Sequence, residues 1–201
     1  MIYDKLKPFI INDIFTDSDI EYLYSVINSL PQKNQEIVEE LGLVVFHNFE
    51  KFENSFIEHA VSKIQPFFQE KLIPCEMYFS KYTNETNYFS KLPPHYDHKE
   101  ERRITLDVQI NSNIDWPLLV EEQEFTLKNN DGLVFSGTDQ LHWRKNIKLK
   151  NNDFVDMFLF QFKVDIIDDL LSENDKKIQQ EKSQLYAEKT GIYVEPIRLE
   201  Q

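Results

Sequence analysis

The sequence predicts a mainly β fold with flanking helices. Several segments of strand length are rich in aromatic and β-branched residues, which favour strands. The 16 Phe and 9 Tyr stand against only 4 Gly, which indicates a core filled by aromatic rings. Segments with apolar residues at helical spacing lie on both sides of this β region. A chain of 201 residues is large enough for a real core and is most simply one domain.

The N-terminal part is expected to be helical. Thr16 begins a capping pattern, and the apolar residues that follow recur at helical spacing until Pro31 stops the helix. A second helix is expected from about Asn54, kinked or divided by Pro66. Between the two helices, residues 31–40 are polar and acidic. We expect one domain, residues 1–201, in three parts: helical support at 1–72, a β core at 73–165, and a C-terminal helix and tail at 166–201.

The β core is expected to end in a hairpin and a last strand before a final helix. The run from Asn129 to Gly132 is the clearest turn, because Asn and Gly tolerate the positive φ that a hairpin requires. Ser172 and Asp175 stand in capping positions of the final helix, and Gly191 is its stop. This helix either closes over the barrel or pairs with a second subunit. The strands of the core are expected at 77–84, 104–111, 133–137, 141–143 and 153–162.

Two histidines and one aspartate have the pattern of a metal site. On a strand, side chains two residues apart point to the same face, so His95 and Asp97 can reach one ion while Tyr96 points away. His142 follows the apolar segment 133–137, and a closed or sandwiched sheet would bring it alongside. Three such ligands on one side of an octahedral ion leave three positions open, which is how non-haem Fe(II) oxygenases hold iron.

The same segments, in their order, resemble the Fe(II)/2-oxoglutarate-dependent dioxygenases over about residues 76–162. The resemblance is carried by 77–84, His95-x-Asp97, 104–111, 131–137 and His142-Trp143-Arg144. The opening at 8–17 is also similar to the start of small prolyl-hydroxylase-like and phage-type members. The resemblance implies a double-stranded β-helix, or jelly roll, with Fe(II) held by His95, Asp97 and His142 at its open end.

The resemblance also requires a cation for the distal carboxylate of 2-oxoglutarate, and the planar fork of Arg can bond both oxygens. The family commonly places Arg or Lys on the strand after the second histidine, but residues 153–162 contain neither. Arg144 lies two residues beyond His142 and would share its face. We expect Arg144 to anchor 2-oxoglutarate, with Tyr82 and Thr105 as hydroxyl partners, unless Arg144 merely pairs with one of the many surface carboxylates. The alternative anchors are Arg103, Lys163 and Lys81.

The reaction that the resemblance implies is oxidative decarboxylation of 2-oxoglutarate to succinate and CO2, coupled to hydroxylation of an unactivated C–H bond. Family halogenases lack the carboxylate ligand, so Asp97 disfavours halogenation. A peptidyl side chain and a small molecule both remain open as substrates, and ascorbate is a further cofactor to consider. Tyr96 and Trp143 either line the pocket or serve in packing. Two rival classes remain: a jelly-roll binding module without turnover, and a cupin-type metalloenzyme that recruits His98 and does not use 2-oxoglutarate.

Composition narrows the partners and the compartment. The net charge of −13 argues against nucleic acid, because binding phosphates needs clustered Lys and Arg, and it also disfavours an anionic membrane surface. No stretch of about 18 apolar residues is present to span a bilayer. The N-terminus lacks a secretion signal and Cys75 is the single cysteine, which together favour the cytoplasm. The expected partners are a small-molecule or protein substrate and, through the C-terminal helix, a second copy of the chain.

Overall fold

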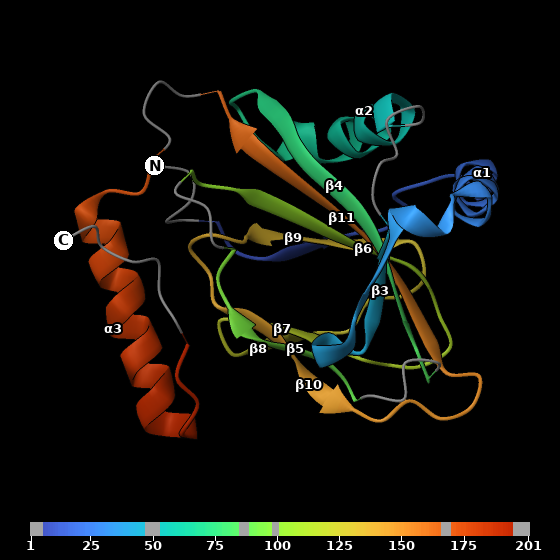
Figure 1. Ribbon diagram of the computed structural model, residues 1–201. Coiled ribbons are helices and arrows are strands. Elements are labelled where there is room, and N and C mark those ends of the chain that lie inside the picture. The colour runs from blue at the N-terminus through green and yellow to red at the C-terminus, as the bar shows by residue number, and fades with distance from the viewer. Residues whose placement is uncertain (1–5, 47–52, 85–88, 98–100, 166–169, 195–201) are drawn as a thin grey trace.

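Two antiparallel β-sheets face each other and form a jelly roll (Figure 1). The computed structural model describes residues 6–46, 53–84, 89–97, 101–165 and 170–194. In the order of their pairing, the strands of the larger sheet are β1 Phe9–Ile11, β9 Asp131–Ser136, β6 Ile104–Ser112, β11 Phe154–Val164, β4 Leu72–Thr83, β3 Leu43–Phe46 and β2 Gln35–Val38. The strands of the smaller sheet are β5 Ser90–His95, β10 His142–Ile147, β7 Leu118–Val120 and β8 Gln123–Phe125.

The larger sheet separates the hydrophobic core from the interior of the jelly roll. On β6, Leu106 and Val108 belong to the core that this sheet forms with α1 Asp17–Ser29 and α2 Glu53–Ile64. Because successive side chains of a strand alternate in direction, the intervening Thr105 and Asp107 point to the opposite face, toward the smaller sheet. Both helices therefore cover the outer side of the larger sheet (Figure 1), while Thr105 and Asp107 face the interior.

The helices follow the signals in the sequence. Thr16 caps α1 and forms a reciprocal capping box with Asp19. Pro66 divides the second helix rather than bending it, because α2 ends at Ile64 and a 3-10 turn, Gln65–Phe67, follows. None of the described helices is both long enough and apolar enough to cross a membrane.

The N-terminal part supplies strands as well as helices, which the sequence did not predict. β1 extends the larger sheet beside β9, and β2 and β3 extend its other end beside β4. The polar and acidic segment 31–40 contains β2, whose residues are mostly exposed. An edge strand pairs on one side only and is solvated, so its sequence keeps the polar character of a loop.

The C-terminal helix α3, Glu173–Thr190, packs against the outside of the smaller sheet. It is capped by Ser172 with Asp175 and ends at Gly191, whose φ of 74° is left-handed. The rings of Trp143 on β10 and Tyr186 on α3 lie 5.2 Å apart. In Figure 1 α3 stands to the left of both sheets, and its Tyr186 shares a hydrophobic cluster with Leu119 and Trp143 of the smaller sheet.

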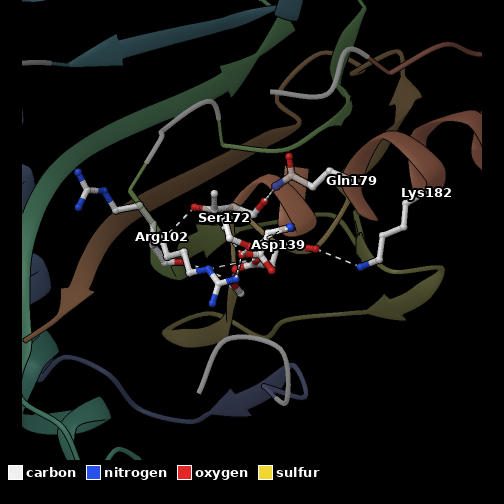
Figure 2. A network of polar contacts seen from close by, with 9 residues as sticks. Arg102, Asp139, Ser172, Gln179 and Lys182 are labelled. Atoms are coloured by element: carbon white, nitrogen blue, oxygen red, sulfur yellow. Dashed lines mark hydrogen bonds and ion pairs between the residues drawn. The ribbon is translucent and has the colours of Figure 1, made fainter. Parts of the chain in front are cut away.

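Polar contacts hold α3 to the loop that leads into His142 (Figure 2). Gln179 donates a hydrogen bond to the carbonyl of Thr138, and Lys182 donates one to the carbonyl of Asp139 at 3.1 Å. The guanidinium of Arg102, 2% exposed, lies 2.7 Å from the carboxylate of Asp175 and 3.8 Å from that of Asp139. Arg102 therefore joins the start of α3 to the same loop.

We expect Arg102→Met to lower the free energy of unfolding by about 1–3 kcal/mol, because it leaves the half-buried carboxylates of Asp139 and Asp175 without this cation. Urea denaturation followed by circular dichroism measures this change. The matched control is Lys177→Met on the same helix, whose ion pair with Glu181 is about 70% exposed on both sides and should contribute nothing measurable. Equal stability of the two variants would show that Arg102 does not fasten α3.

Candidate metal centre

His95 and His142 lie opposite each other on adjacent strands. His95 ends β5, His142 begins β10, and the two residues are paired in register. Their rings are 4.1 Å apart. Asp97 follows β5, and its Oδ1 lies 3.9 Å from Nε2 of His95 and 3.6 Å from Nε2 of His142. One ligand atom from each residue lies within 4.8 Å of the others, which is close enough to hold one metal ion.

Backbone carbonyls orient both imidazoles. Nδ1 of His95 lies 2.8 Å from the carbonyl oxygen of Pro93, and Nδ1 of His142 lies 3.0 Å from that of Gln140. A carbonyl oxygen can only accept, so the proton of each ring is on Nδ1. Nε2 of each ring faces Asp97, and in the neutral imidazole it is the atom that carries the lone pair, which is the tautomer that a metal needs.

Asp97 is held in place by three hydrogen bonds on the side away from the histidines. Thr105 Oγ1 and Gln161 Nε2 donate to its Oδ2 at 2.9 and 3.0 Å, and its backbone N–H donates to the carbonyl of Gly137 at 2.9 Å. Its Oδ1 is thereby directed toward the histidines.

The charge of Asp97 is retained at neutral pH. Burial raises the pKa of this carboxyl, but the hydrogen bond and charge of His142, with smaller contributions from His95 and Thr105, outweigh burial and bring it to about 2. For His142, burial lowers the pKa, but the hydrogen bond and the charge of Asp97 raise it by more. The pKa of His142 therefore lies above its ordinary value. The ionised carboxylate is the form that binds a cation.

Gly137 makes room for this carboxylate. A Cβ at residue 137 would overlap Oδ2 of Asp97 and Oγ1 of Thr105, and it would lie 2.8 Å from Cγ of Asp97. Only glycine therefore fits where the end of β9 passes the metal ligand.

The three residues open into a cavity of about 280 Å³ between the two sheets. Aliphatic and aromatic side chains form most of its wall. The polar and charged residues that line it besides the three candidate ligands are Tyr78, Ser80, Tyr82, Asp107 and Arg144. The cavity thus combines a candidate metal centre with one guanidinium in an apolar enclosure.

Arg144 is buried at the wall of this cavity, with 3% of its surface exposed. It donates to the carbonyl of Trp116, and its guanidinium lies 5.2 Å from the ring of that residue. Its second terminal nitrogen lies 3.4 Å from Oδ2 of Asp107 on β6. Arg144 therefore pairs with a buried carboxylate rather than with a surface one.

The other two residues predicted for co-substrate binding, Tyr82 and Thr105, have different surroundings in the structure. Tyr82 is buried and lines the cavity, with its ring 4.8 Å from that of Trp116. Thr105 does not line the cavity and donates to Asp97, so it orients a ligand of the metal centre. The predicted contact of the Thr105 hydroxyl with 2-oxoglutarate stays a prediction.

The alternative anchors Arg103, Lys81 and Lys163 are not among the residues that line the cavity. Arg103 pairs with Glu101 at 2.8 Å and contacts the sulfur of Cys75. Lys81 lies over the ring of Tyr24, and Lys163 is absent from the cavity wall. His98 lies outside the described residues. Tyr96 and Trp143 belong to a separate hydrophobic cluster with Tyr186, so neither lines the pocket.

Sequence reasoning missed Gln161, Asp107 and Tyr78. The signal for the first two was present, because polar residues at alternate positions of a fully buried strand must face something polar. Thr105 and Asp107 alternate in this way on β6, as does Gln161 among the apolar residues of β11. Tyr78 carried no such signal, since aromatic residues fill most of the core.

The comparisons with known proteins identify the fold. No protein-family model matches the sequence, and no curated protein matches it. Solved structures do match. An oxidoreductase of the 2OG-Fe(II) oxygenase family from Burkholderia pseudomallei superposes with a TM-score of 0.61 at 10% identity, over 80% of this chain and 85% of that one. The chain has the fold of the 2-oxoglutarate/Fe(II) oxygenases.

Two further oxygenases with 2-oxoglutarate bound have the same fold. HygX from Streptomyces hygroscopicus, solved with nickel, 2-oxoglutarate and hygromycin B, matches with a TM-score of 0.60 at 11% identity, over 84% of this chain and 87% of that one. The viral collagen prolyl hydroxylase of Paramecium Bursaria Chlorella virus-1, in complex with 2-oxoglutarate, matches with a TM-score of 0.53 at 14% identity, over 81% of this chain and 98% of that one. The jelly roll predicted from the sequence is confirmed.

Proposed function

We propose that the protein is an Fe(II)- and 2-oxoglutarate-dependent dioxygenase that hydroxylates an unactivated C–H bond. The observation that carries this proposal is the convergence of two imidazole Nε2 atoms and one carboxylate in the cavity that also holds Arg144. Two histidines and one carboxylate are the ligand set of non-haem iron oxygenases. In this role His95, Asp97 and His142 hold Fe(II), and Arg144 binds the distal carboxylate of 2-oxoglutarate.

Fe(II) with bound 2-oxoglutarate supplies the chemistry, in which O2 and 2-oxoglutarate are converted to succinate and CO2 while one oxygen atom enters the C–H bond of the substrate. The chain positions these groups and excludes water from them. Pro93 and Gln140 fix the imidazoles, and Thr105 and Gln161 fix Asp97. Such outer contacts hold the ligands in one orientation, which lowers the cost of binding the ion.

The substrate is proposed to present an uncharged group to the centre. The cavity wall is mostly aliphatic, with Val38, Leu41 and Leu43 from β2, β3 and the turn between them. Its charged groups besides the candidate ligands, Asp107 and Arg144, pair with each other. A peptidyl side chain and a small molecule both fit this description. The jelly-roll neighbours include a collagen prolyl hydroxylase, and HygX with the small molecule hygromycin B bound.

The test is an anaerobic titration of the metal-free protein with Fe(II) and then 2-oxoglutarate, recorded by visible absorption. The unaltered protein is expected to give the charge-transfer band of a bidentate complex, and His95→Ala should give none because a ligand is missing. Arg144→Gln should still bind Fe(II) but should weaken the affinity for 2-oxoglutarate at least about tenfold, because charge-assisted hydrogen bonds to the carboxylate are lost. Lys145→Gln, at the exposed neighbouring position, should match the unaltered protein.

Turnover separates the dioxygenase from the two rival classes. Succinate should form when O2 is admitted to the complex, and the yield can be compared with and without ascorbate. A binding module would give the band without succinate. A metalloenzyme of another kind would bind the metal and give no band with 2-oxoglutarate, and either result contradicts the proposal.

A further inference from the structure

Asp107 occupies the place where a co-substrate carboxylate would bind Arg144. Its side chain lies on the interior face of β6, is 10% exposed, and approaches the guanidinium to 3.4 Å. This separation exceeds the 2.7–2.9 Å of a tight charged hydrogen bond, so the pair is loose. The carbonyl of Trp116 takes another N–H of the same guanidinium. Arg144 is therefore already neutralised, and part of its hydrogen-bonding capacity is in use, before any co-substrate arrives.

A second carboxylate on this guanidinium creates a conflict of charge. Two carboxylates that share one buried cation repel each other strongly, and such a pair relieves the repulsion by keeping one proton. Water cannot screen the repulsion well, because the apolar cavity wall surrounds both groups. Asp107 is already buried before 2-oxoglutarate binds, so it is the carboxyl that takes the proton.

The surroundings of Asp107 make its carboxyl easier to protonate than an ordinary one. Burial raises its pKa above the ordinary value, and Arg144 does not fully reverse that effect. Directly beside it in the sheet stand Leu133 on β9 and Leu159 on β11, which offer no charge. The titratable and charged groups that face it from packed elements are Arg144 on β10, Tyr78 and Tyr82 on β4, and, in the metal centre, His142 and Asp97.

The geometry points to Asp107 as a specificity-determining residue that takes up one proton from solvent when 2-oxoglutarate binds. This inference rests on the proposed function. The incoming distal carboxylate replaces Asp107 as the charged partner of Arg144. The protonated Asp107 then becomes a hydrogen-bond donor beside the bound carboxylate of 2-oxoglutarate. An ionised Asp107 would repel that carboxylate. No covalent bond changes, and the proton comes from water or buffer.

The test measures proton uptake directly. 2-Oxoglutarate is titrated calorimetrically into the protein loaded with Ni(II) under argon, at pH 7.5, in buffers of different ionisation enthalpy. The slope of the observed enthalpy against that ionisation enthalpy gives the number of protons bound. We expect about one proton for the unaltered protein and none for Asp107→Asn, whose neutral amide imitates the protonated acid in shape.

The dissociation constant gives a second, independent readout. Binding consumes a proton, so the dissociation constant of the unaltered protein should rise with pH. The rise should be up to about tenfold per pH unit once the pH exceeds the pKa of Asp107 in the protein without 2-oxoglutarate. Asp107→Asn should show no such rise between pH 6.5 and 8.5, and at pH 8.5 it should bind 2-oxoglutarate at least about tenfold more tightly than the unaltered protein.

A matched control uses a second buried acid. Asp156 is 4% exposed, and burial is the main cause of its raised pKa. Its carboxylate accepts a hydrogen bond from the hydroxyl of Tyr24 on the other face of the sheet. Asp156→Asn should keep the uptake of one proton. Binding of 2-oxoglutarate without proton uptake in the unaltered protein would overturn the role of Asp107 and leave the proposed function standing. Absence of 2-oxoglutarate binding in both the unaltered protein and Asp107→Asn would overturn both.

Discussion

Asp97→Asn is expected to lower the affinity for Fe(II) at least about 100-fold and to abolish 2-oxoglutarate turnover. Loss of only an outer partner of a metal ligand already costs 10–100-fold, and this substitution removes a ligand. The two donors Thr105 and Gln161 will keep the amide oxygen on their side, where Oδ2 lies now. The amide nitrogen then faces the histidines, and it has no lone pair to offer a metal.

The same substitution should leave the fold intact, because both donors retain an acceptor. We expect a cooperative thermal transition close to that of the unaltered metal-free protein, measured by circular dichroism beside an anaerobic Fe(II) titration. Asp115→Asn, at an exposed position outside the cavity, serves as the control and should bind Fe(II) normally. Retention of tight Fe(II) binding in Asp97→Asn would show that the metal is held elsewhere.

The sequence predicted elements whose signals are local. Thr16 and Ser172 each begin a helix because their own side chains cap it, and Gly191 ends one because it adopts a left-handed φ. The strand β2 was missed because its residues are mostly exposed, so it lacks the apolar pattern by which strands are recognised. What makes it a strand is pairing with β3, a tertiary contact that no local pattern encodes.

The residues of the candidate site also divide into those that local geometry predicts and those that only tertiary contacts bring together. His95 is the last residue of β5 and Asp97 lies two residues further along, just beyond the strand. Their approach to one ion was predicted from the two-residue repeat of strand geometry alone. The pairing of His142 opposite His95 required the sheet to be known. Asp107 and Gln161 reach the site from β6 and β11, and their partners Arg144 and Asp97 are 37 and 64 residues away in sequence. Contacts of this kind depend on register between distant strands, which the sequence does not specify locally.

Gly137→Ala is expected to weaken Fe(II) binding about as severely as the loss of a ligand, although residue 137 contacts no metal. Its Cβ would overlap the carboxylate of Asp97 and the hydroxyl of Thr105 together. Asp97 cannot withdraw, because Gln161 and the carbonyl of Gly137 hold it from two sides. The carboxylate can therefore only rotate, which moves Oδ1 from its place beside the two Nε2 atoms. We expect at least about a 100-fold loss of Fe(II) affinity, measured by anaerobic titration, and a loss of about 1–3 kcal/mol of stability from overpacking.

The control separates loss of metal binding from loss of stability. Gly191→Ala meets no atom within 4 Å, but its φ of 74° is unfavourable for alanine, so it should destabilise the protein by about 1 kcal/mol. Gly191 lies at the end of α3, away from the cavity, and its variant should bind Fe(II) with unchanged affinity. If both glycine variants lost Fe(II) binding in proportion to their stability, the effect would come from general unfolding. A loss confined to Gly137→Ala would show that the close approach of β9 to Asp97 positions the metal ligand.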